Sequence, residues 1–275
     1  MKMKKLFSIL AVCALLAACS SDDETPEIKG NKITSVTVQQ TMKNGQTWQS
    51  VDKVSYDDQG RLKQVDYITF SYEDGKVIAD CANTAINQRF IRRCEVTTPK
   101  GNAGTMKVEY HNLPDGYSSY TTTGTIAQNG NVVTLDLAHS FDDGSIYHEY
   151  LKWQMDNNGR LEFSSIDYDY GDGPTNSKTT PSYDPSGRMM NQDLTAMAFY
   201  VQSAELEDLV MMVAGYLPAL KKDAPVSFTI DSYLNSELQS SETVNTAYSF
   251  DENGKCTGAD LSLAGTLLQT LKFAY

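Results

Sequence analysis

The chain has 275 residues, with 23 Lys or Arg against 35 Asp or Glu, so its formal net charge is −12. This acidic balance argues against a nucleic-acid partner and against electrostatic adhesion to anionic lipid, because phosphates and lipid headgroups attract basic surfaces. The length suits one large β domain or two small ones.

The first eighteen residues have the parts of an export signal. Three lysines lie among the first five residues, and an apolar run follows over 6–18. That run is too short to cross a bilayer as a stable helix. It ends in Leu-Ala-Ala before Cys19, which resembles a bacterial lipobox, where the cysteine thiol takes a diacylglyceryl thioether. We predict a lipoprotein signal peptide over 1–18; the alternative is an ordinary signal followed by an incidental cysteine.

An acidic tether is expected over 19–32, and with the signal removed the net charge falls to −15 because 20 basic residues then face 35 acidic ones. Directly after Cys19 the chain carries Ser20, Ser21, Asp22, Asp23 and Glu24. This run resembles the export tag of Bacteroidetes surface lipoproteins. The resemblance implies an outer-membrane protein that is held by lipid such as palmitate and exposed at the cell surface. The plainer interpretation is a solvated start to a flexible linker.

Three cysteines remain for the folded part once Cys13 leaves with the signal and Cys19 carries lipid. A disulfide between Cys81 and Cys94 is possible, and a bridge closing so short a loop contributes roughly 3 kcal/mol. An odd count leaves at least one thiol unpaired. The alternative is that all three cysteines, Cys256 included, are buried free thiols.

A turn motif recurs along the chain, with its glycines 14 or 15 residues apart over long stretches. Each full copy has a bulky residue, Asp, two further residues, Gly, a basic residue and an apolar residue. Full copies begin at Tyr56, Met155, Tyr183 and Phe250, and shorter ones at Tyr72 and Phe141. The Asp carboxylate accepts hydrogen bonds from backbone N–H groups later in the turn, and Gly supplies a positive φ. The motif predicts β-hairpins, so its aspartates are structural and not catalytic.

Strands joined by such turns are antiparallel neighbours, and the strands between them alternate apolar with polar residues. The predicted fold is therefore mainly β: a long antiparallel up-and-down meander in a curved or rolled sheet, forming a single domain over 33–275. The last strand closes the sheet by burying its odd-numbered face, from Leu267 to Tyr275. A membrane-spanning barrel is disfavoured, because Lys, Asp and Gln occupy the face that would meet lipid.

Units of the form Tyr-Asp-x-x-Gly-Arg-Leu, within 51–78, 141–190 and 247–262, resemble those of Bacteroidetes surface lipoproteins of unknown function. They also resemble the Tyr-Asp repeats of large secreted toxins. The resemblance implies export and a β-rich fold, and it brings no catalytic residues.

One stretch, 191–220, lacks hairpin signals and instead places apolar residues at helical spacing. We predict one helix or two short ones there. The segment either plugs one open face or end of the curved sheet or forms a movable lid over an apolar cavity, and the plug is favoured because apolar stripes usually belong to the core.

Motifs for catalysis and cofactors are absent from the sequence, which has three histidines, no His-Glu-x-x-His and no Gly-x-Ser-x-Gly. We therefore expect no enzyme activity, no cofactor and no zinc site. Asp167, Asp169 and Asp172 form a weak calcium candidate, although an ordinary acidic hairpin turn is the better interpretation. Arg89, Arg92 and Arg93 either bind an anionic glycan or pair with nearby acidic residues.

Tyrosines are the remaining lead, and the candidates for a ligand patch are Tyr147, Tyr150, Tyr168 and Tyr170. Exposed on a wet face they bind sugars or peptides, whereas buried they are core. The first functional hypothesis is a non-enzymatic surface module that binds a glycan or another exported macromolecule. The second is a carrier of a hydrophobic small molecule, with 191–220 as its lid. The membrane is the expected partner through the N-terminal lipid, and nucleic acid is not.

The lipid anchor is open to a direct test. Replacing Cys19 by Ala removes the acceptor thiol, so the precursor should stay unprocessed and the mature domain should leave the detergent phase in a partition assay. Cleavage and partitioning unchanged from those of the parent protein would contradict the lipoprotein interpretation.

Overall fold

The computed structural model describes residues 32–41, 46–81, 91–110, 120–141, 144–169, 173–184, 195–196, 206–217 and 225–275. The predicted signal, Cys19 and the acidic run lie outside these residues and stay predictions. The described strands are β1 (Ser35–Thr41), β2 (Thr47–Tyr56), β3 (Leu62–Val65), β4 (Ile68–Glu73), β5 (Lys76–Asp80), β6 (Ile91–Thr97), β7 (Ala103–Tyr110), β8 (Tyr120–Asn129), β9 (Val132–Phe141), β10 (Ile146–Met155), β11 (Leu161–Tyr168), β12 (Thr175–Tyr183), β13 (Pro225–Leu234), β14 (Glu237–Phe250), β15 (Cys256–Leu263) and β16 (Thr266–Ala274). Helix α2 spans Leu206–Ala214.

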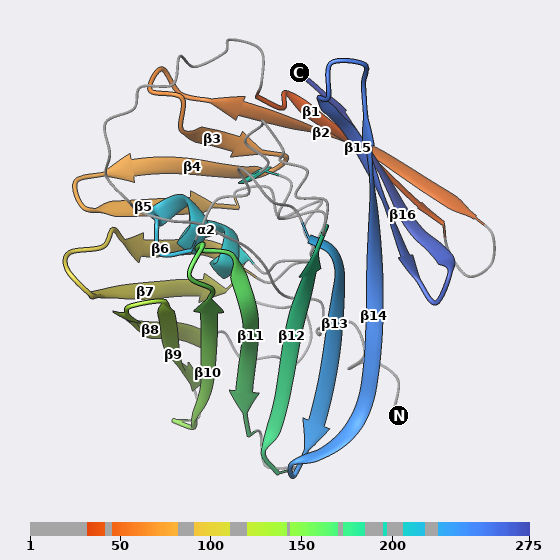
Figure 1. The fold of residues 1–275 in the computed structure, drawn as a ribbon. Coiled ribbons are helices and arrows are strands. Elements are labelled where there is room, and N and C mark those ends of the chain that lie inside the picture. The colour runs from red at the N-terminus through yellow and green to blue at the C-terminus, as the bar shows by residue number, and fades with distance from the viewer. Residues whose placement is uncertain are drawn as a thin grey trace.

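The strands form one antiparallel meander that closes into a barrel (Figure 1). Each strand pairs with its neighbours in the chain, and β1 pairs with β16 to complete the ring. The predicted meander is confirmed, in its rolled form. In β16, Leu271 and Phe273 are buried as predicted, but Leu267 is exposed. It lies at the tip of the β15–β16 hairpin, next to the turn at Ala264 and Gly265.

The two faces of the barrel wall differ sharply in polarity. Strand β9 buries Val133, Leu135 and Leu137, and the buried residues of the other strands join them in one apolar cluster. The alternate residues face outward and are polar: on β7 to β9 they include Thr105, Lys107, Thr121, Thr123, Thr125, Thr134 and Asp136. The barrel therefore has an apolar interior and a wet exterior.

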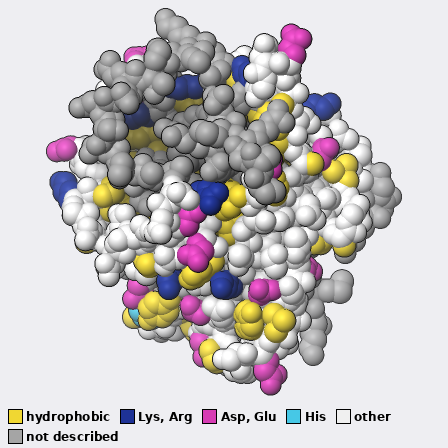
Figure 2. Space-filling view, in the orientation of Figure 1, with side chains coloured by type: hydrophobic (Ala, Val, Ile, Leu, Met, Phe, Trp, Pro, Cys, Tyr) yellow, Lys and Arg dark blue, Asp and Glu magenta, His cyan; other side chains and the backbone are white. Residues whose placement is uncertain are grey.

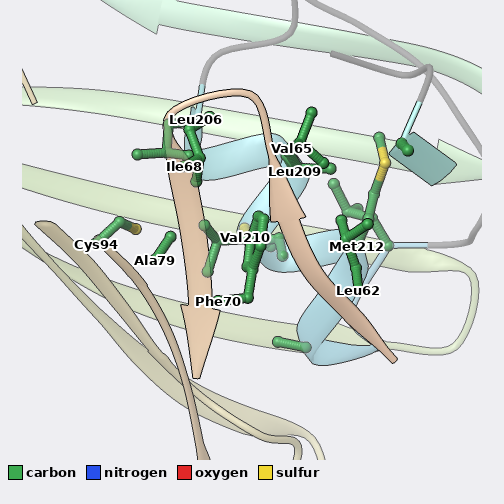
Figure 3. Close-up of a cluster of buried hydrophobic side chains, with 14 of the residues drawn as sticks. Leu62, Val65, Ile68, Phe70, Ala79, Cys94, Leu206, Leu209, Val210 and Met212 are labelled. Atoms are coloured by element: carbon green, nitrogen blue, oxygen red, sulfur yellow. The ribbon is translucent and has the colours of Figure 1, made fainter. Parts of the chain in front are cut away.

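Helix α2 fills part of that interior. It packs against β5 and β6, and eight of its nine residues are buried. Figure 3 shows Leu206, Leu209, Val210 and Met212 against strand residues that include Phe70. A helix that is buried on nearly all sides belongs inside a core. The predicted helix is confirmed over this span, which lies within 191–220, and its packing is that of a plug.

The C-terminal end of α2 is fixed to the barrel wall. Gly215 takes a positive φ of 90° and its N–H donates to the Met212 carbonyl, which ends the helix. Tyr216 follows, and its hydroxyl donates to the carbonyl of Ala103 on β7, 3.3 Å away. The ring reaches this position because Gly104 has no side chain, and a Cβ there would occupy the space of the Tyr216 hydroxyl.

The recurring turn is held by three side chains that we call the clasp: the turn Asp, the basic residue four positions later, and a tyrosine at the end of the second strand after the turn. In the first clasp, Asp57 Oδ1 accepts from the N–H groups of Gln59 and Arg61, and Arg61 Nε donates to Asp57 Oδ2 at 2.7 Å. The Arg61 guanidinium lies 3.9 Å from the ring centroid of Tyr72, whose hydroxyl donates to the Leu62 carbonyl.

The same arrangement returns twice. Asp156, Arg160 and Tyr183 form the second clasp, and Asp251, Lys255 and Tyr275 form the third. The glycine of each turn has a φ between 74° and 79°. The hairpins predicted from these three copies are confirmed, and the clasp gives their bulky residues a further role. Tyr72 and Tyr183 each begin one copy of the motif. Each also packs on the basic residue of the motif copy before its own, which is Arg61 for Tyr72 and Arg160 for Tyr183.

Because the chain alternates direction, all three clasps lie at one end of the barrel, which we call the clasp end. The opposite end, the loop end, carries the connections that follow the odd-numbered strands. The chain enters β1 at the clasp end, where Lys32 Nζ donates to the Gly60 carbonyl at 2.9 Å.

Leu209 offers a test of the plug. It is fully buried, so Leu209→Ala should lower the free energy of unfolding by about 2–5 kcal/mol through lost burial and a residual cavity. Urea denaturation measures the change. Leu238→Ala is the matched control, since that side chain is 56% exposed and the change should stay within about 0.5 kcal/mol. Equal effects of the two substitutions would contradict an interior position for α2.

The clasp predicts a dependence of stability on pH. Burial raises the pKa of Asp156, but hydrogen bonds from Arg160 and the Asn158 backbone outweigh it and hold the pKa below the ordinary value of 3.8. Since the folded-state pKa is the lower one, this contribution is present above about pH 4 and is lost as the pH falls through the folded-state value. Asp156→Asn should destabilise the protein at neutral pH and flatten the loss of stability in acid. Urea midpoints across that range measure it.

The control for this substitution is Asp58→Asn, which changes an exposed turn carboxylate outside the clasp. The role assigned to Asp156 is wrong if its variant and the control show the same acid dependence.

Candidate functional site

A groove of about 850 Å³ lies on the barrel wall at the loop end, over β10 to β13. Its walls are formed by Ile146, Tyr147, His148, Tyr150, Asp167, Tyr168, Asp169, Pro174, Thr175, Asn176, Lys178, Tyr233 and Ser236. Most of these side chains belong to the outer face. Figure 2 shows hydrophobic, basic and acidic side chains gathered in the lower part of the view, where these strands lie. The volume is within the range of small-molecule sites.

Two stacked rings form one wall of the groove. His148 and Tyr150 alternate onto the outer face of β10, and their rings lie 5.9 Å apart at an interplanar angle of 14°. His148 is held from β9, where Asp136 Oδ1 lies 3.1 Å from its Nδ1. Tyr150 is 50% exposed. The two nearly parallel rings are thus held next to each other at the exposed surface.

A polar pair lies beside this surface. Tyr150 is directly opposite Asp167 on β11, Asp167 is opposite Asn176 on β12, and Asn176 is opposite Tyr233 on β13. Asn176 Nδ2 donates to Asp167 Oδ1 at 2.7 Å. We call these four residues the cross-strand row. It places hydrogen-bonding groups between two tyrosines on one face of the sheet.

The remaining residues border the row. Lys178 lines the groove, and its Nζ lies 4.6 Å from the ring centroid of Phe163. Tyr147 and Tyr168 alternate onto the inner face and reach the groove at the rim. Burial raises the pKa of Tyr168, and the charge of Glu149 raises it further. Its hydroxyl therefore stays protonated and able to donate.

A second polar cluster lies inside the barrel, behind the groove. The His139 ring shares a hydrogen bond of 2.7 Å with Thr122 Oγ1 through Nδ1, and its Nε2 lies 3.3 Å from Glu149 Oε2. Thr122 is fully buried and His139 nearly so. A buried hydroxyl next to a histidine is out of reach of a substrate in this structure. The cluster therefore satisfies polar groups within the wall.

The predicted ligand-patch tyrosines come together in part. Tyr147, Tyr150 and Tyr168 all line the groove, with Tyr150 on the outer face, while Tyr170 lies outside the described residues. Whether they bind a ligand stays a prediction. The remaining groove residues His148, Asn176, Lys178 and Tyr233 were not predicted as ligand contacts from the sequence. Pairing the strands and comparing opposite residues would have found Asn176 and Tyr233, because both follow from the hairpin register.

The other predicted site residues are placed as follows. Asp167 and Asp169 also line the groove, and Asp172 is not among the described residues. Nowhere in the described part of the chain do three His, Cys, Asp or Glu side chains gather to hold a metal ion. Cys81, Cys94 and Cys256 are buried, and the bridge between the first two stays a prediction. Arg93 pairs with Asp80 and Glu95.

Among the described residues, no helix has the length and apolar character needed to cross a membrane.

Comparisons with known proteins give a fold and no family. No family model and no curated protein matches the chain. The crystal structure of a porin-like protein from Bacteroides vulgatus is similar over 89% of this chain and 98% of its own, with a TM-score of 0.70 and 14% identity. A porin-like protein from Bacteroides uniformis aligns over 89% and 97% at 16% identity, with a TM-score of 0.38. The first likeness shows that the two proteins share the barrel fold.

Proposed function

We propose that this protein is a lipid-anchored, non-enzymatic binding module of the outer membrane, exposed at the cell surface, and that its groove binds a glycan. The observation that carries the proposal is the exposed His148–Tyr150 surface beside the hydrogen-bonded pair of Asp167 and Asn176.

The polarity of the barrel wall supports a barrel that stands clear of the bilayer. Spanning barrels turn an apolar band toward lipid and a polar face inward. Here the outer face carries residues such as Lys107 and Thr123, and the inner face carries the apolar cluster. The likeness to a porin-like protein supports an outer-membrane location. Attachment through the predicted lipid on Cys19 is consistent with both observations.

The direction of the barrel supports a groove that faces away from the membrane. The predicted tether over 19–32 joins the barrel at the clasp end, where Lys32 contacts Gly60. The groove lies on the strands at the loop end, most of a strand length away from the clasp end. A strand of ten residues spans about 34 Å. The groove is then the part of the protein most accessible to a large ligand outside the cell.

The composition of the groove favours sugars over apolar ligands. Pyranose rings present C–H faces that pack on aromatic rings, and hydroxyl edges that need donors and acceptors. Tyr150 and Tyr233 supply ring surface, and Asp167, Asn176 and Lys178 supply polar groups. A carrier of a hydrophobic molecule needs an enclosed apolar cavity, whereas α2 packs tightly against the inner wall.

The test is glycan binding by the full-length lipoprotein in detergent, against an immobilised panel of neutral polysaccharides. At least one should bind and be recovered uncleaved. Tyr150→Ala should weaken that binding about tenfold, or about 1.4 kcal/mol, because it removes one of the aromatic rings on which a sugar would pack. Trp48→Ala is the matched control, because that side chain is an exposed aromatic residue on β2, outside the groove. Absence of binding, or equal losses in both variants, would refute the proposal.

A further inference from the structure

We infer that the groove takes an uncharged oligosaccharide of at least three sugars, lying across strands β10 to β13 and not along them. This inference rests on the proposed glycan binding and adds the length, direction and charge of the ligand. It follows from the cross-strand row.

The direction follows from strand register. Tyr150, Asp167, Asn176 and Tyr233 are successive cross-strand partners, so they form a line perpendicular to the strands on one face. Neighbouring strands lie about 4.8 Å apart, so the three steps from Tyr150 to Tyr233 cover roughly 14 Å. One pyranose ring is much shorter than that line. Only a chain of several sugars can contact both tyrosines at once.

The order of side chains along the row matches such a chain. Its ends are aromatic and receive the faces of terminal sugars, and its centre is polar. A carboxylate and an amide can each make several hydrogen bonds. The bond between Asp167 and Asn176 therefore leaves both side chains capable of further bonds, and it fixes their orientation toward a central sugar. The stacked His148 extends the aromatic surface at the β10 end.

The charges of the groove favour an uncharged ligand. Asp167 and Asp169 contribute two carboxylates to its lining, whereas Lys178 contributes one ammonium group. A uronic acid or sulfated sugar placed over Asp167 would bring like charges together at the centre of the row, which is unfavourable. The acidic charge of the whole chain acts in the same direction.

The experiment is calorimetric titration of the full-length lipoprotein in detergent with linear gluco-, manno- and xylo-oligosaccharides of one to six sugars. Oligogalacturonates of the same lengths are the charged counterparts. For the series that binds, affinity should rise at least tenfold from one sugar to three and change little beyond the length that the row covers. The galacturonates should bind at least tenfold more weakly.

Variants locate the ligand. Tyr233→Ala should weaken binding of the trimer about tenfold and leave that of the monosaccharide nearly unchanged if the single sugar occupies the His148–Tyr150 surface. Trp48→Ala should alter neither, and melting temperatures confirm that each variant is folded. Affinity independent of length, preference for galacturonates, or full trimer binding by the Tyr233 variant overturns this inference alone. Failure of every oligosaccharide and polysaccharide to bind overturns the proposed function with it.

Discussion

The interior of a sixteen-stranded barrel has to be occupied, and this requirement shapes the rest of the molecule. Barrels of this strand number leave a wide lumen that strand side chains alone do not fill, and in porins that lumen holds water. Water is a poor filling for much of the lumen here, because many of the inward residues are Val, Leu, Ile and Phe. Helix α2 supplies the missing apolar volume. The wall can then turn its polar residues outward, and the groove can form on the outer surface.

The clasps solve a second problem, which is how so many hairpins keep their register. In a strand a slip by one residue moves every side chain to the other face. Each clasp ties a turn to the end of the second strand after it through a ring, a cation and a backbone carbonyl, as Arg61, Tyr72 and Leu62 do. The clasps therefore fix the strand register at the end of the barrel where the chain enters.

The sequence predicted the features that rest on local chemistry. The turn aspartates, the glycines with positive φ and the alternation in β9 are all short-range patterns, and the structure has them. Three turns at the loop end were not visible in the same way, because Asp66, Asn235 and Ala264 take positive φ without the Asp-x-x-Gly signature. The pairing of β16 with β1 was also hidden, since it joins residues more than two hundred positions apart. The groove was predicted only in part. Tyr150 and Asp167 were candidate site residues, whereas Asn176 and Tyr233 are recognised only from the register of the paired strands.

The pairing of the first strand with the last has a consequence for how the chain reaches its native state. Until β16 has left the export machinery, β1 and every partly assembled sheet after it present an unpaired edge to other chains. Contacts between such distant segments form late, because the loop that they close is nearly the whole domain. If the N-terminus is already fixed to a membrane, many such edges are concentrated in one plane, where they can pair with each other. The lysines and glutamates along the outer face, and the short strands β3 to β5, then discourage pairing between chains during assembly as well as in the finished barrel.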